Sequence, residues 1–311
     1  MSAISYYDDN GIMSQAFLLR DDGIIDSLIV EKKDEFDYID EWKDSIFCYS
    51  CRENKVLSEL YGFKCLVVRF AFSRVERLHL EEQEKVMLSM CEQLTNRLRA
   101  QNAYINIRIP THIVDLTRAF NQCFNQEGLY FCGGTVEEIQ TRGSDLWDKV
   151  NPDVKLFFAD KSYCEAKGTE LVSLAREAFK SYMGQYHISP VTAPLAGTIY
   201  ENWIEETIAK AQEDTILVAE LNEEVAGFYT ILHEADIDDG LLTAVSSRHR
   251  KHNVYKSMLI YLMDHAERQG RHFVSSTQLD NFVAQRTWAA LGMRPIYSIY
   301  NFHYDRRYTT D

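Results

Sequence analysis

Five consecutive residues, Arg248-His249-Arg250-Lys251-His252, place cationic side chains next to one another. A short apolar segment typical of a β-strand, Leu241–Val245, precedes them. After them, apolar residues recur at the i, i+3, i+4, i+7 spacing of a helix face: Tyr255, Met258, Leu259, Leu262, Met263 and Ala266. The start of a helix has N–H groups without intrahelical acceptors and the positive end of the helix dipole. A strand, a basic turn and a helix in this order therefore predict an anion-binding site at the turn.

A second strand and a second helix follow this unit. The strand is predicted over Phe273–Thr277 and the helix from about Asn281. Together the two pairs make a β-α-β-α unit, and the rest of the chain is organised around it.

Two stretches of this unit resemble signatures of the GNAT superfamily of acyl-CoA-dependent N-acyltransferases. The signature R-x-x-G-x-G/A falls on Arg250–Tyr255, and N-x-x-A-x-x-x-Y-x-x-L-G-F falls on Asn281–Met293. Within the superfamily, Gln185–Pro190 and Ser298–His303 resemble the branch that includes dTDP-fucosamine acetyltransferase. The resemblance covers roughly residues 153–304, and it is fainter over the first half.

The resemblance implies an α/β protein of two domains. Residues 151–311 would form a GNAT fold, a mixed and mostly antiparallel sheet flanked by helices. Residues 1–150 would form a smaller α/β sheet domain that shapes the acceptor side. A length of 311 residues independently suggests two domains. A turn-rich stretch with Gly143 and Asn151-Pro152 fits the boundary.

Local patterns predict the elements of each half. In the first half they predict a hairpin over 16–30, a solvated helix or loop over 31–44, strands over 65–72, 104–110 and 129–137, and helices over 81–100 and 114–125. In the second half they predict helices over 169–179 and 195–212, a loop over 182–194, a hairpin over 215–233 and a turn over 238–240.

The resemblance also implies that acetyl-CoA is the acyl donor and where it binds. The implied donor-binding residues are Ala244, Val245, Arg250, Lys251, His252, Asn253, Val254, Tyr255, Lys256, Ser257 and Asn281. The backbone N–H near Val245 would face the thioester carbonyl. Asn281 is similar to a residue that orients pantetheine, and it also fits the N-cap of its helix.

Two positions differ from the family pattern. Asn253 and Tyr255 occupy places usually held by glycine or a small residue, which let N–H groups approach phosphate closely. Asn tolerates unusual backbone angles, but the Tyr255 side chain must point away from the pocket. Trp288 stands where the family has a tyrosine, and an indole N–H is not a useful acid.

Acyl transfer needs a base for the incoming ammonium and an acid for the leaving thiolate. His187 is the candidate base, because histidine can accept a proton at neutral pH, and His303 is a second candidate. Tyr300 or Tyr297 could supply the acid, water could do so, or the site no longer catalyses. The predicted catalytic positions are His187, Asn281, Trp288 and Tyr300.

Composition limits the class of protein. The formal net charge is −14, which argues against broad binding to nucleic acid or anionic membranes. We find no 18-residue apolar run and no signal-peptide pattern, so the cytoplasm is expected. Seven cysteines, an odd number in a long chain, do not suggest a disulfide framework. Cys48 and Cys51 form a C-x-x-C without a second ligand pair, and no metal site is expected.

Three functions remain open. The first is an N-acetyltransferase that moves an acetyl or acyl group from acyl-CoA to a primary amine of a small molecule such as a nucleotide-linked amino sugar. The second keeps the chemistry but takes the acyl group from an acyl carrier protein, because Tyr255 crowds the turn. The third is a non-catalytic binding protein on the same fold. Exposed edge strands also suggest a homodimer.

Overall fold

The computed structural model describes residues 36–42, 45–73, 78–124, 128–140, 146–180, 182, 184–210, 213–233 and 237–307. The chain divides into two compact units. The first unit comprises Met1–Thr135, Ile188–Val191 and Tyr297–Asp311, and the second comprises Val136–His187 and Thr192–Ile296. The hairpin predicted over 16–30 lies outside the described residues.

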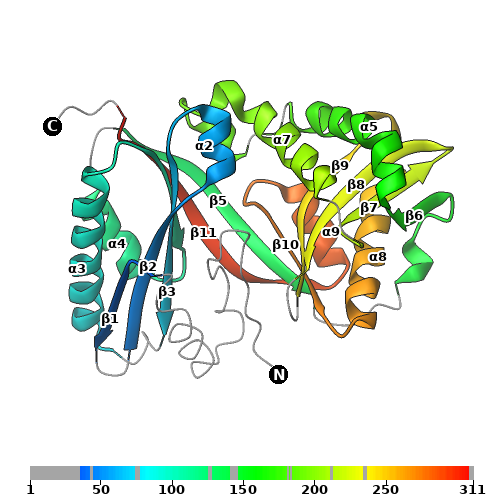
Figure 1. Ribbon diagram of the computed structural model, residues 1–311. Coiled ribbons are helices and arrows are strands. Elements are labelled where there is room, and N and C mark those ends of the chain that lie inside the picture. The colour runs from blue at the N-terminus through cyan, green and yellow to red at the C-terminus, as the bar shows by residue number, and fades with distance from the viewer. Residues whose placement is uncertain are drawn as a thin grey trace. The chain divides into compact units, whose positions relative to one another are not determined.

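The first unit is a sheet with its two longer helices packed on one face (Figure 1). Its strands are β1 (Tyr38–Trp42), β2 (Ser45–Glu53), β3 (Cys65–Ser73), β4 (Tyr104–Pro110) and parts of β5 (Leu129–Gln140) and β11 (Met293–Asp305). β3 and β4 are parallel, whereas β1–β2, β2–β3 and β4–β11 are antiparallel. Its helices are α2 (Lys55–Tyr61), α3 (Leu80–Arg99) and α4 (Val114–Cys123). Strand β1 corrects the prediction of a solvated helix or loop over 31–44.

Alternation along the strands of the first unit separates an apolar face from a polar one. Phe70 of β3, Ile107 of β4 and Phe302 of β11 belong to the hydrophobic core beneath α3 and α4. The predicted apolar stripe of α3 is buried in the same core: Val86, Met87, Met90, Leu94 and Leu98. The residues between the apolar strand positions face the other way, and several of them are polar and buried.

The second unit has three layers (Figure 1). Its central strands follow the order β10 (His272–Gln278), β9 (Ile237–Val245), β8 (Glu224–His233), β7 (Ile216–Leu221) and β6 (Val154–Phe158). Only β9 and β10 are parallel among these neighbours. One face packs against α5 (Lys161–Phe179) and α7 (Ala196–Ala209), and the other against α8 (Val254–Arg268) and α9 (Phe282–Ala290). The predicted fold class, a mixed and mostly antiparallel sheet flanked by helices, is confirmed.

Some boundaries differ from the predictions. Helix α5 begins at Lys161 instead of residue 169, because the Asp160 carboxylate caps it by accepting the Tyr163 N–H at 2.7 Å. A short helix, α6 (Gln185–Ile188), lies in the predicted loop. The segment 238–240 is not a turn but part of β9. Asp238 stays buried within this strand because Arg271 pairs with it at 2.6 Å.

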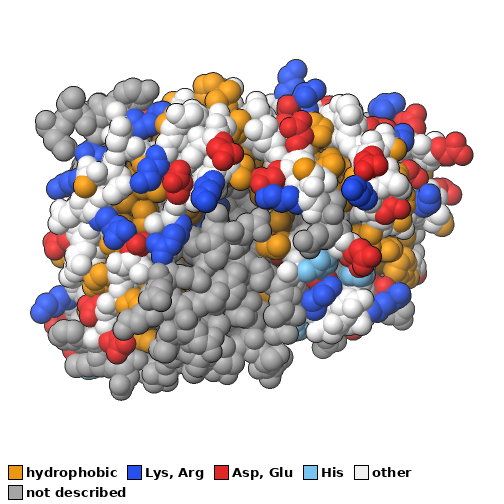
Figure 2. Space-filling model, viewed as in Figure 1, with side chains coloured by type: hydrophobic (Ala, Val, Ile, Leu, Met, Phe, Trp, Pro, Cys, Tyr) orange, Lys and Arg blue, Asp and Glu red, His pale blue; other side chains and the backbone are white. Residues whose placement is uncertain are grey.

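No described helix is long and apolar enough to cross a membrane. Figure 2 shows acidic and basic side chains interspersed over the face that it draws. Among the side chains coloured on that face, the acidic ones are therefore not gathered into one patch.

Candidate functional site

The basic turn folds as the strand–turn–helix pattern predicts. The 3₁₀ turn η5 (Ser247–His249) leads into Arg250, and α8 begins at Val254. Lys251 and Asn253 take left-handed conformations, with φ of +70° and +56°. Asn253 is the N-cap, and the first turn of the helix closes when Ser257 donates its N–H to the Asn253 carbonyl at 2.8 Å. The N–H groups of residues 254–256 therefore have no acceptor within the helix, and they are free to bind an anion.

The five cationic residues divide into two groups. Arg248 and His249 both bind the carboxylate of Glu224, at 3.2 Å and 3.3 Å. Arg250, Lys251 and His252 are exposed, and within the described part of the chain no hydrogen bond or ion pair engages their side chains. Lys256 is half-buried and is likewise not engaged there. The residues that follow η5 thus keep their positive charge available beside the open N–H groups.

Asn151 braces this turn, which the sequence did not reveal. Its side-chain amide donates to the His252 carbonyl at 2.9 Å, and its backbone N–H donates to the Ser257 hydroxyl at 3.0 Å. Ser257 is fully buried, so its side chain supports the turn and does not face a ligand. The sequence predicts Ser257 as a donor-binding residue, and this stays a prediction. In the sequence, the Asn151-Pro152 pair indicated only a domain boundary, and it did not indicate that Asn151 contacts the turn.

Strands β9 and β10 separate next to the turn. They pair from Ile237 and His272 up to Gly240 and Ser275. Both continue further, β9 to Val245 and β10 to Gln278, but the described residues beyond these points form no pair between the two strands. The far edge of β9 is therefore open over its last residues.

The backbone direction along β9 decides which residues line that edge. Ser246 donates its N–H to the carbonyl of Ala226 on β8, at 2.9 Å. Backbone groups alternate along a strand, so Ala244 also faces β8, whereas Thr243 and Val245 direct their N–H and C=O groups away from it. This fits the predicted N–H at Val245. The Ala244 side chain is buried in the core, and its assignment to the donor-binding residues stays a prediction.

Tyr255 and Trp288 contact each other. The indole N–H of Trp288 donates to the Tyr255 hydroxyl at 2.7 Å. Trp288 is 1% exposed, and the Tyr255 ring stacks on Tyr229 with 6.4 Å between centroids. The Tyr255 side chain is therefore directed into the core of the second unit, not over the phosphate-binding side of the turn.

Two further hydroxyls form a chain beside this contact. The Tyr229 hydroxyl lies 2.7 Å from that of Ser275. Ser275 donates its single proton to the Gly240 carbonyl at 3.0 Å, so Tyr229 must donate to Ser275. This hydroxyl chain runs in one direction, from Tyr229 to Gly240. It ends at the last rung that joins β9 and β10.

Burial raises the pKa of the Tyr255 hydroxyl well above its usual value. The proton therefore stays on the phenol at neutral pH. Neither Tyr229 nor Ser275 stood out in the sequence, because single hydroxyl residues within apolar strands carry no recognisable spacing.

Both the oxygen and the nitrogen of the Asn281 side-chain amide are hydrogen-bonded. Its oxygen accepts the Ala284 N–H at 3.3 Å as the N-cap of α9, and its nitrogen donates to the Thr277 hydroxyl at 2.8 Å. Within the protein, Asn281 therefore acts as the N-cap of α9, which is one of the two roles that the sequence suggests.

His187 belongs to a cluster of aromatic rings around Tyr200. The Phe179 ring stacks on Tyr200 at 4.2 Å between centroids, and the His187 ring lies parallel to it at 6.3 Å. Tyr182 and Tyr186 contact the same ring by their edges. The His187 Nδ1 atom is buried without a hydrogen-bond partner among the described residues. Burial lowers the pKa of His187, so the imidazole is neutral at pH 7.

Comparison with known proteins assigns this architecture. Residues 171–293 match the profile of the Acetyltransferase (GNAT) family. Residues 171–293 form a GNAT domain. No curated protein matches the chain.

Two solved structures share the fold of the GNAT domain and its companion unit. A GCN5-related N-acetyltransferase from Sphaerobacter thermophilus is 12% identical, with a TM-score of 0.55 over 86% of this chain and 82% of that one. A GCN5-related N-acetyltransferase from Kribbella flavida is 10% identical, with a TM-score of 0.51 over 91% of this chain and 95% of that one. At such identities the likeness concerns the fold alone.

The GNAT domain contains the donor turn, the open edge of β9, the hydroxyl chain and His187. Tyr300 lies beyond it, in the first unit, where its ring packs against Phe131 and the hydrophobic core.

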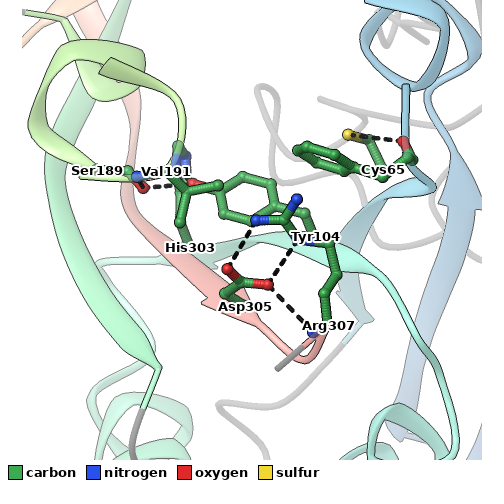
Figure 3. Close-up of polar contacts among 8 residues, drawn as sticks. Cys65, Tyr104, Ser189, Val191, His303, Asp305 and Arg307 are labelled. Atoms are coloured by element: carbon green, nitrogen blue, oxygen red, sulfur yellow. Dashed lines mark hydrogen bonds and ion pairs between the residues drawn. The ribbon is translucent and has the colours of Figure 1, made fainter. Parts of the chain in front are cut away.

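His303 also lies in the first unit and is fully buried. Its Nδ1 lies 2.7 Å from the Tyr104 hydroxyl, which lies 2.6 Å from the Ser189 hydroxyl (Figure 3). Burial, with a contribution from Arg108, lowers the pKa of His303 to about 3. His303 is thus neutral at physiological pH and already hydrogen-bonded, which corrects its prediction as a second candidate base.

Proposed function

We propose that the protein is an N-acyltransferase that moves an acetyl or acyl group from acyl-CoA to a primary amine of a small molecule. One observation carries this proposal: a helix N-terminus with open N–H groups and unengaged cations lies beside the open edge of a β-strand. The first feature suits a diphosphate and the second suits an extended amide chain. Coenzyme A has both groups, joined in one molecule.

The residues present fit an acyl-CoA donor. The N–H groups of residues 254–256 and the side chains of Arg250 and Lys251 would hold the diphosphate. Thr243 and Val245 would pair through their backbone with the amide groups of pantetheine, as a further strand pairs with a sheet edge. A bound thioester supplies an activated carbonyl, and the Val245 N–H is the donor that would polarise it.

Two side chains would handle the protons. His187 Nδ1 is neutral and unoccupied, so it would accept the proton of the incoming ammonium. The Tyr255 hydroxyl holds its proton at neutral pH and would deliver it to the leaving sulfur. Trp288 and Tyr229 act as positioning residues, because they fix the phenol from both sides.

The position of the Tyr255 side chain favours acyl-CoA over an acyl carrier protein. The carrier-protein alternative arose because a bulky residue would crowd the turn. Since the ring instead packs on Tyr229, the approach to the N–H groups is not narrowed by it. The acceptor class rests on the resemblance to the dTDP-fucosamine acetyltransferase branch, which favours a nucleotide-linked amino sugar. Action in the cytoplasm, which the sequence patterns lead us to expect, is part of the same proposal.

Calorimetric titration with acetyl-CoA and with CoA tests the donor assignment. We expect saturable binding of both, and at least about 10-fold weaker binding to Arg250→Glu. Arg294→Glu is the matched control, since Arg294 is exposed in the same unit and should leave the affinity unchanged. Equal affinity of both variants and the wild type would refute the donor turn. A screen of primary amines for thiol release then separates an enzyme from a non-catalytic binding protein.

A further inference from the structure

The end of β5 buries a carboxylate that the acyl transfer described above does not use. Val136–Gln140 is the part of β5 that belongs to the second unit, and β10 is its neighbour in the sheet. Glu138 lies within this part and is 6% exposed. Acidic side chains are almost never buried to this extent unless another group pairs with them, because burial removes their hydration. The Glu138 carboxylate is therefore costly at this position unless a partner binds it.

Within the described part of the chain, Glu138 has no such partner. No hydrogen bond or ion pair engages its carboxylate there, and its Oε2 atom is fully buried. Burial raises the pKa of Glu138, and no cationic side chain of the described residues acts to lower it. Asp238, a buried carboxylate of the same unit, differs in this respect, because His233 and Arg271 both bind it. Glu138 is thus able to accept hydrogen bonds and positive charge from a ligand.

Glu138 lies close to the hydroxyl of Tyr255. Burial is the main reason that the pKa of Tyr255 is raised well above its usual value, and the negative charge of Glu138 makes a smaller contribution in the same direction. Such a direct effect of one charge on another group falls with distance, so the two side chains are near each other. The proposed acid and the unpaired carboxylate therefore occupy the same region of the second unit.

The chemistry of acyl transfer brings the amine to this region. In the tetrahedral intermediate, the amine nitrogen and the thioester sulfur are bonded to the same carbon atom. Tyr255 is the proposed proton donor to that sulfur, so a group close to Tyr255 is also close to the incoming nitrogen. Aliphatic amines are ammonium ions at neutral pH, and a buried carboxylate attracts such a cation strongly because little water screens it.

We propose that Glu138 binds the ammonium group of the acceptor and thereby selects cationic amines. This inference rests on the proposed function. The carboxylate would accept hydrogen bonds from the ammonium group, which would be the partner that Oε2 lacks, while His187 remains the base that removes the proton. The acceptors would therefore be aliphatic amines. Aryl amines and alcohols reach the site without charge, so they would leave the carboxylate unpaired and bind poorly.

Steady-state kinetics of Glu138→Gln tests the proposal, with the aliphatic amine that reacts fastest in the screen as the probe. We expect KM for this amine to rise at least about 10-fold, because a buried charge pair is lost. The change in kcat should be much smaller, since the interaction is made with the bound substrate. Glu267→Gln is the matched control, because Glu267 is exposed in the last turn of α8, and it should behave as the wild type does. An unchanged KM for the amine in Glu138→Gln would overturn the proposal.

Two further measurements separate a loss of charge from a loss of structure. Glu138→Asp keeps a carboxylate, so it should retain more affinity for the amine than Glu138→Gln does. The alcohol analogue of the amine, with a hydroxyl in place of the ammonium group, should inhibit the wild type and Glu138→Gln equally. Equal KM values in the two Glu138 variants, or a parallel loss of affinity for the alcohol, would assign Glu138 a structural role and overturn the proposal.

Calorimetry with acetyl-CoA distinguishes this proposal from the proposed function. Glu138→Gln should bind acetyl-CoA as tightly as the wild type, because the carboxylate contacts the acceptor and not the donor. A wild type that acylates no amine would refute the proposed function, and the role of Glu138 with it. A wild type that acylates amines, together with an unchanged KM in Glu138→Gln, would refute the role of Glu138 alone.

Discussion

The Trp288 indole donates a hydrogen bond to the Tyr255 hydroxyl across 2.7 Å. Tyr255 lies in the first turn of α8, and Trp288 lies in α9. These two residues depart from the pattern that the chain resembles, one where a small residue is usual and the other where a tyrosine is usual. Their contact suggests that the two departures are coupled. The phenol is supplied by Tyr255 of α8, and the Trp288 indole occupies the position on α9 where the family has a tyrosine.

Replacing Tyr255 with phenylalanine should lower kcat about 100-fold and leave KM for acetyl-CoA nearly unchanged, because general acid catalysis is typically of this size. Steady-state kinetics with the best amine from the screen measures this. Trp288→Phe keeps the phenol and removes only its hydrogen-bond donor, so its loss should be smaller. The double variant Tyr255→Phe/Trp288→Tyr should regain part of the activity. Unchanged kcat in Tyr255→Phe would exclude the phenol as the acid.

His187 predicts how the rate depends on pH. Burial lowers its pKa, so the neutral base persists below the usual value of histidine and is lost only as the pH falls through that lower pKa. We expect kcat/KM to fall on the acid side in the wild type and this limb to disappear in His187→Gln, with activity reduced about 100-fold. Tyr186→Phe is a control, since Tyr186 contacts the same Tyr200 ring. An acid limb that survives in His187→Gln would assign the base elsewhere.

Asp238 should be a main contributor to the stability of the second unit. It is 2% exposed and binds both His233 Nδ1 at 2.7 Å and Arg271 at 2.6 Å. Asp238→Asn would leave Arg271 without its buried partner, so we expect a loss of about 3–5 kcal/mol in urea unfolding. A loss below about 1 kcal/mol, as for an exposed pair, would contradict this role.

The pairing of His233 with Asp238 makes the stability of the protein depend on pH. The hydrogen bond to Asp238 raises the pKa of His233, so the folded state holds this proton more tightly than the unfolded state. The contribution is therefore complete below the unfolded pKa and is lost as the pH rises through the folded one. Urea midpoints measured between about pH 5 and 8 should show this decline in the wild type. The decline should be absent in His233→Gln.

Gly240 makes room for the hydroxyl chain. A Cβ at this position would lie 2.6 Å from Tyr229 Cε1 and 2.9 Å from Phe273 Cζ. Gly240→Ala should therefore destabilise the protein by about 1–3 kcal/mol and displace Tyr229, lowering kcat as well. Gly197→Ala is the matched control, because nothing lies within 4 Å of its added Cβ in α7, and it should be neutral or slightly stabilising. Equal thermal midpoints of the two variants would refute the steric argument.

The sequence by itself determined the strand–turn–helix unit at Leu241–Ala266 and the α/β class. Periodicity and the cationic turn are local properties, and a helix that starts beside cations binds anions wherever it lies in a fold. It also indicated that Asn253 could take a left-handed conformation, which the structure shows. It failed at Asp238–Gly240, where consecutive acidic residues before a glycine suggested a turn. Pairing with His233 and with the distant Arg271 allows Asp238 to be buried within a strand.

The tertiary structure decided which side chains of this unit face a ligand. Tyr255 points into the core because Tyr229 and Trp288, far from it in sequence, offer a ring and a donor. Ser257 is occupied by Asn151, and the backbone of Ala244 faces β8. Contacts between residues far apart in sequence produce no recognisable sequence pattern, because they depend on how strands pair and helices pack.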